Sequence, residues 1–72
     1  MGAIQKVSID GIVVRITDNA ILLDVDGMEC WIPRSQLTLP EGGDLEEMLD
    51  SGEVYDFGIP QWLYVEKFEL AD

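Results

Sequence analysis

Carboxylates are the residues whose number and spacing could do chemistry in this 72-residue chain. Fifteen Asp and Glu residues stand against four Lys and Arg, the formal net charge is −11, and there is no histidine. Seven of the carboxylates fall within sixteen residues that contain no base: Glu41, Asp44, Glu46, Glu47, Asp50, Glu53 and Asp56. Carboxylates spread in this way can imitate the charges of a nucleic-acid backbone and attract a groove lined by Lys and Arg. The pattern predicts a surface that binds a basic protein, with a solvated charged face as the alternative.

A second group of carboxylates, in residues 24–29, looks like a calcium-binding loop. An EF-hand loop needs oxygen ligands at fixed positions. When Gly27 is aligned with the glycine that such a loop requires, Leu22 stands at the first ligand position and Pro33 at the last. Neither residue has a side-chain oxygen, so the sequence predicts no metal site. Incidental cation binding between carboxylates on facing strands is the weaker alternative.

Cys30 is the single cysteine, which excludes an internal disulfide. A thiol nucleophile needs a base, and strand alternation places Cys30 opposite Leu23 in the core, where a neutral thiol is inert. The sequence therefore predicts neither an enzyme activity nor a cofactor. The chain also lacks a signal-peptide pattern and an apolar run long enough to span a bilayer, which predicts a cytoplasmic protein without a membrane partner.

Two further residues are candidate anchors for a partner. Trp31 lies on the less apolar face of the expected sheet with Arg15 near it, and an exposed aromatic side chain there could stack on bases. The favoured interpretation is that Trp62 of a C-terminal helix covers Trp31. Arg34 follows a rigid proline at the rim of the sheet, where it either reaches a partner or caps backbone groups that the ending strand leaves free.

A hairpin centred on Asp26-Gly27 must position these side chains. Asp-Gly between apolar runs is a strong hairpin signal, because a type I′ turn needs positive φ at both central residues. Side chains alternate between the two faces of a strand, so the turn also sets the register. The expected pairs are Val25 with Met28, Leu23 with Cys30 and Ile21 with Ile32 on the apolar face, and Leu22 with Trp31 and Asp24 with Glu29 on the other.

The strand before this hairpin, residues 5–17, changes phase along its length. Val7 and Ile9 are odd-numbered, whereas Ile12, Val14 and Ile16 are even-numbered. A β-bulge at Asp10-Gly11, with glycine at positive φ, would bring both halves onto one face. Asp18-Asn19 is typical of the next turn. The register that follows pairs Ile16 with Ile21, Val14 with Leu23 and Ile12 with Val25.

The second half of the chain adds a helix, a strand and a C-terminal element. The third strand ends at Pro33 with a short 3₁₀ turn, and Asp44 and Gly52 cap a short helix. Residues 53–59 alternate as a fourth strand, while residues 61–70 favour a helix over a fifth strand. The sequence thus predicts one mainly β domain, a small and strongly bent antiparallel sheet or SH3/OB-like barrel with a C-terminal helix.

Two short segments carry a resemblance to known proteins. Residues 31–36 read Trp-Ile-Pro-Arg-Ser-Gln and residues 59–63 read Ile-Pro-Gln-Trp-Leu. Together with Asp26-Gly27, they resemble a loose family of small phage and prophage proteins that have a Trp-Ile/Leu-Pro-Lys-Ser-Gln segment and an Ile-Pro-Glu-Trp-Leu helix start. The resemblance implies a phage-type origin and a small β-rich domain without an assigned activity. The acidic insert at residues 41–53 departs from that pattern and leaves a shared function open.

These features predict a small, acidic, non-enzymatic interaction protein, phage-encoded and acting in the host cytoplasm. It would bind a basic nucleic-acid-binding protein and inhibit it, as anti-CRISPR and DNA-mimic proteins do. The predicted partner-binding residues are Glu41, Asp44, Glu46, Glu47, Asp50, Glu53, Trp31 and Arg34. Direct nucleic-acid binding is disfavoured because few bases are present to release counterions, so a single-stranded nucleic-acid-binding module is the second hypothesis. A structural phage subunit or a homo-oligomer is the third.

Overall fold

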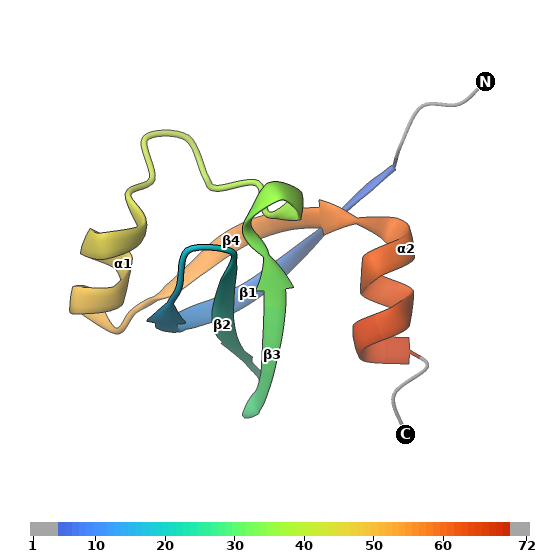
Figure 1. The fold of residues 1–72 in the computed structure, drawn as a ribbon, viewed down its shortest axis with the longest axis horizontal. Coiled ribbons are helices and arrows are strands. Elements are labelled where there is room, and N and C mark those ends of the chain that lie inside the picture. Colours follow the sequence, from blue (N-terminus) through green and yellow to red (C-terminus); the bar gives the residue numbers. More distant parts are fainter. Residues whose placement is uncertain (1–4, 70–72) are drawn as a thin grey trace.

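The computed structural model describes residues 5–69, which form a four-stranded antiparallel sheet with short helices (Figure 1). The elements in chain order are β1 (Lys6–Ile16), β2 (Ala20–Val25), β3 (Met28–Pro33), the 3₁₀ turn η1 (Arg34–Gln36), α1 (Leu45–Ser51), β4 (Val54–Pro60), α2 (Gln61–Tyr64) and its π-helical continuation η2 (Val65–Glu69). The strand order is β3-β2-β1-β4. The predicted mainly β fold is confirmed, and the sheet stays open instead of closing into a barrel.

The β2–β3 hairpin has the predicted turn and register. Asp26 and Gly27 take φ angles of 55° and 84°, as a type I′ turn requires. Asp24 Oδ1 accepts a hydrogen bond of 2.8 Å from the Gly27 N–H, which ties the turn to the preceding strand. Every predicted pair, from Val25 opposite Met28 to the strand ends, is observed.

The predicted bulge in β1 is real but lies elsewhere. Ile16 faces Ile21 as expected, and the register then shifts around Val14, so that Val13 faces Leu23. The expected pairings of Val14 with Leu23 and of Ile12 with Val25 are therefore wrong. Val14 is consequently directed outward and 37% exposed.

Gly11 explains why the bulge is not at Asp10-Gly11. Gly11 is buried, and a Cβ there would lie 3.3 Å from Val25 Cγ2 and 3.4 Å from the Asp24 carbonyl oxygen. Its φ is not in the left-handed region. Glycine at this position therefore allows close contact between β1 and β2 within a regular strand, and the phase change is made three residues later.

One apolar core covers a single face of the sheet. Its members are Ile9, Val13, Ile21, Leu23, Ile32, Met48, Phe57, Ile59 and Leu63. Met28, expected on this face, is 47% exposed because it lies at the hairpin tip, beyond the reach of the core. Phe57 and Ile59 point inward from β4 while Val54 and Asp56 point outward, as the alternation predicts. Each fully buried side chain of this size contributes about 1.5–3 kcal/mol relative to exposure.

The two helices lie at opposite ends of the sheet (Figure 1). α1 has the predicted caps: Asp44 accepts a hydrogen bond from the Glu46 N–H, and Gly52 takes a left-handed φ of 65°. Met48 packs into the core, whereas its neighbour Leu49 is 38% exposed. A helix of this length is marginal alone, so the caps and the single buried methionine hold it in place.

The C-terminal segment is a helix, as favoured, and not a fifth strand. Pro60 serves as its N-cap, and the Gln61 N–H donates to the Gln5 carbonyl oxygen at 2.8 Å. Leu63 is buried, and the rings of Tyr64 and Phe68 stack with centroids 5.3 Å apart. Position 70, the last of the predicted helix, lies outside the described residues.

Candidate functional site

The acidic segment, defined as residues 41–56, runs from the loop before α1 through the helix into β4. All seven of its carboxylate residues are exposed. Because Met48 turns toward the core, Glu46, Glu47 and Asp50 face solvent. The fold therefore displays the predicted carboxylates at the end of the sheet where α1 lies (Figure 1).

The charges on α1 only partly complement the dipole of the helix. Glu46 and Glu47 lie in the first turn, where the partial positive charge of the helix N-terminus favours them. Asp50 lies near the other end, where the dipole is unfavourable, and no basic residue occupies the last turn. The acidic surface is thus not arranged for the stability of the helix alone.

The outer face of the sheet carries two further carboxylate pairs. Asp10 on β1 lies directly opposite Asp56 on β4, and Asp24 lies opposite Glu29 in the hairpin. Like charges at facing positions of an antiparallel pair repel each other. The sequence interpretation missed the Asp10–Asp56 pair, because it depends on the pairing of β1 with β4, which no local signal specifies.

The basic residues Lys6 and Arg34 are bonded to neutral acceptors. Lys6 Nζ donates to Thr38 Oγ1 at 2.6 Å, and Arg34 Nη1 donates to the Thr17 carbonyl oxygen at 3.1 Å. The Arg34 backbone N–H also donates to the Asn19 carbonyl oxygen. Arg34 thus ties the end of β3 to the β1–β2 turn, while its side chain stays exposed.

Trp31 is exposed, which corrects the favoured expectation that Trp62 covers it. Trp31 is 43% exposed and Trp62 is 55% exposed. The reason is the docking of α2, which packs against β4 and β1 and not onto the outer face of the hairpin. The register places Arg15, Leu22 and Trp31 in one row across β1, β2 and β3. The predicted proximity of Arg15 and Trp31 on the same face is therefore present.

Cys30 occupies the predicted position opposite Leu23 and packs at the border of the core. Its side chain is partly buried and unbridged. Within residues 5–69, no cluster of three or more His, Cys, Asp or Glu side chains could hold a metal ion.

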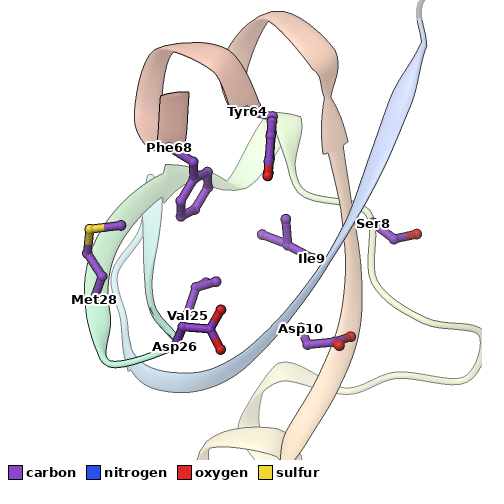
Figure 2. A pocket seen from close by; sticks show the side chains of 8 residues that line it. All are labelled: Ser8, Ile9, Asp10, Val25, Asp26, Met28, Tyr64 and Phe68. Carbon is purple, nitrogen blue, oxygen red and sulfur yellow. The ribbon is translucent and has the colours of Figure 1, made fainter. Parts of the chain in front are cut away.

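A pocket of about 490 Å³ opens between β1, the hairpin tip and the C-terminal helix (Figure 2). The lining residues are Ser8, Ile9, Asp10, Val25, Asp26, Met28, Tyr64 and Phe68. Tyr64 and Phe68 come from the helix and Ile9 from β1, and all three point into the same space (Figure 2). The pocket combines residues from three elements, so the position of the helix over β1 was required to predict it.

A scan against protein-family models and searches of curated proteins and of solved structures find no match to this chain. Among the helices within residues 5–69, none is long and apolar enough to cross a membrane. The fold and the surface geometry therefore carry the functional argument.

Proposed function

We propose that this chain is a non-enzymatic interaction protein whose acidic segment binds a basic, nucleic-acid-binding protein and blocks its nucleic-acid site. The observation that carries the proposal is the exposure of all seven carboxylates of residues 41–56. The side-chain hydrogen bonds of Lys6 and Arg34 go to neutral oxygens and not to these carboxylates.

Electrostatics gives this surface its mode of action. A formal charge of −11 attracts a basic partner over a Debye length of about 8 Å at physiological salt and speeds encounter. The capped helix α1 holds part of the charge on a fixed backbone, so less conformational entropy is lost on binding. Trp31 and Arg34 are the proposed anchors, since aromatic and Arg side chains dominate binding hot spots.

The proposed class of partner is a host or phage protein that binds DNA or RNA in the cytoplasm. Inhibitors of host defence nucleases, including anti-CRISPR proteins, share this charge and size. The resemblance of the Trp31 and Trp62 segments to phage proteins supports a phage origin for the chain.

Charge reversal on α1 tests the proposal. Tagged wild-type protein and a Glu46→Lys/Glu47→Lys variant are used to pull down proteins from nuclease-treated host lysate at low and high salt. A basic partner should be retained by the wild type at low salt and released at high salt. The variant should associate with the isolated partner about tenfold more slowly, because rim charges act mainly on association.

The matched control is Glu66→Lys/Glu69→Lys, which makes the same charge change at two exposed residues of η2. Equal losses of association rate in the two variants would show that net charge, and not the position of the carboxylates, causes the effect. Undiminished binding by the α1 variant would show that the acidic segment is not part of the interface.

A second candidate function rests on the row of Arg15, Leu22 and Trp31. An exposed tryptophan with a nearby guanidinium can stack on single-stranded bases, at about 1–3 kcal/mol per base. Titration with a single-stranded oligonucleotide should then quench tryptophan fluorescence in the wild type and in Trp62→Ala, but not in Trp31→Ala. A structural role through self-association would instead appear as a dimer or larger species in sedimentation.

A further inference from the structure

The sheet has an unpaired edge beside the pocket. β1 pairs with β4 from Lys6 to Ile12, whereas its ladder with β2 begins only at Ile12, opposite Asp24. The hairpin turns away at residues 26–27, short of the first half of β1. Within the described part of the chain, no strand lies against residues 6–10 on the side away from β4.

Hydrogen bonds identify the backbone groups that this edge presents. Gly58 accepts from the Thr38 N–H at 2.8 Å and donates to the Thr38 carbonyl oxygen at 2.9 Å, so its polar groups point away from β1. Partners in an antiparallel ladder alternate between bonded and non-bonded pairs. Ser8, which lies opposite Gly58, therefore points its own N–H and C=O away from β4, and so does Asp10, two residues further on. Within residues 5–69, no strand pairs with these groups, which can therefore bond to an added strand.

The pocket supplies an apolar floor beside this edge. Ile9 points into the space between Val25 of the hairpin and the rings of Tyr64 and Phe68 (Figure 2). The side chains of the two residues that flank Ile9 are drawn on the other side of β1 (Figure 2). Because these side chains point away from the pocket, the main chain of Ser8 and Asp10 is left on the open side of β1, as strand addition requires.

The charges at the pocket end of the edge are negative, whereas Lys6, at its other end, donates to Thr38 Oγ1. Asp10 and its cross-strand neighbour Asp56 lie on the outer face, and Asp26 lies at the rim beside the hairpin tip. The residues that line the pocket include no Lys or Arg. An added strand would place its outward side chains next to Asp10, where basic residues are favoured by cross-strand pairing.

We propose that this edge of β1 binds an extended segment of a partner protein in which apolar and basic residues alternate. The segment adds a strand beside residues 6–10, which is about five residues or 17 Å of extended chain. Its apolar side chains pack toward Ile9, Tyr64 and Phe68, and its basic side chains lie beside Asp10. Apart from Asp56, the cross-strand neighbour of Asp10, the site is separate from the acidic segment, and it does not depend on the function proposed for that segment.

A labelled peptide tests the proposal directly. The probe is acetyl-Lys-Val-Lys-Val-Lys-Val-Lys-amide carrying a terminal fluorophore, and binding to the full chain is followed by fluorescence anisotropy. The matched probe has the same sequence with N-methyl groups on the amides that face β1. Methylation keeps the charge and the side chains but removes the donors, so it should weaken binding by about tenfold or more.

Two variants at one position provide the complementary test. The Ser8 N–H is outside the β1–β4 ladder, so Ser8→Pro removes only an edge donor and is tolerated by the sheet. Ser8→Ala keeps that donor. The wild type and Ser8→Ala should bind the peptide alike, whereas Ser8→Pro should bind about tenfold more weakly. Thermal melts establish that both variants are folded, and the methylated probe tests the edge even if the proline variant is not.

Several results would overturn the proposal. Equal binding of the methylated and unmethylated peptides would show that the interaction depends on charge alone and not on backbone hydrogen bonds. If neither peptide bound, this edge would not be a binding site. Loss of peptide binding in Glu46→Lys/Glu47→Lys but not in Ser8→Pro would assign the peptide to the acidic segment. Self-association that Ser8→Pro abolishes would make a second copy of the chain the occupant, although two chains of this net charge repel each other.

Discussion

The two ends of the sheet expose different kinds of surface. At one end, α1 contributes the single buried side chain Met48 and surrounds it with carboxylates. At the other end, the C-terminal helix buries Leu63 and holds Tyr64 and Phe68 over an open edge of β1. Charge acts over a distance and tolerates many partner shapes, whereas a strand edge acts at contact and demands an extended backbone. The two proposals therefore assign a steering role to one end of the sheet and a docking role to the other.

Ionic strength should distinguish binding to the acidic segment from binding to the edge of β1. Attraction to the acidic segment falls as the Debye length shortens, from about 10 Å at 0.1 M to about 3 Å at 1 M. Backbone hydrogen bonds and apolar contacts at the edge of β1 are much less sensitive to ionic strength. A partner that uses both surfaces should lose association rate with added salt while its dissociation rate changes little.

The largest expected effects come from truncating the buried anchor of each end. Met48→Ala and Leu63→Ala should each cost about 2–5 kcal/mol of unfolding free energy. Leu63→Ala should cost more, because α2 continues directly from β4 and cannot shift, whereas α1 follows the loop of residues 39–44 and can move to fill the space left by Met48. Urea unfolding measures both, with Leu49→Ala, 38% exposed, as the control of small effect. A cost at Met48 equal to that at Leu63 would mean that α1 is as firmly integrated as the C-terminal helix.

Local signals predicted the parts of each end that short stretches of chain determine. The Asp26-Gly27 turn sets the β2–β3 register because positive φ at two adjacent residues leaves one hairpin geometry. The caps Asp44 and Gly52 were also predictable from local sequence, because each bonds to an amide or a carbonyl within four residues of itself. Exposure of the acidic segment followed from its composition.

The errors have a common physical origin in contacts distant along the chain. The position of the β1 bulge depends on how closely Gly11 approaches Asp24 and Val25. The exposure of Trp31 depends on which strands receive α2, and no residue near Trp31 specifies that choice. The pocket combines β1, the hairpin tip and the helix, so its existence required the whole topology.

An intermediate effect is expected from removing the N-cap of α1. Asp44→Ala deletes the acceptor of the Glu46 N–H and should destabilise the protein by about 1 kcal/mol. Because α1 carries much of the acidic segment and little of the core, the loss should appear as faster amide exchange in residues 45–51 before it appears in the strands. Asp44→Asn, which keeps the acceptor, should restore the protection and separates capping from charge. Uniformly faster exchange over the whole sheet would show that the two ends unfold as one unit.

The smallest effect is expected at the carboxylate pair Asp10 and Asp56, which face each other across β1 and β4. Asp56→Lys replaces the Asp10–Asp56 repulsion by an opposite-charge pair and should stabilise the protein by about 0.2–1 kcal/mol. Asp18→Lys is the control, since it makes the same change of net charge at an exposed turn residue. The gain of Asp56→Lys over that control should shrink in high salt, because screening weakens both the repulsion in the wild type and the attraction in the variant.

This variant also sharpens the distinction between the two surfaces. A lysine at position 56 removes one carboxylate from the acidic segment and places a cation beside Asp10, where the proposed peptide presents its basic residues. Binding of the alternating peptide should therefore weaken in Asp56→Lys and remain unchanged in Asp18→Lys. If the peptide binds both variants alike, the carboxylate of Asp10 takes no part in recognition at the edge, and strand addition must draw its selectivity from the apolar floor at Ile9.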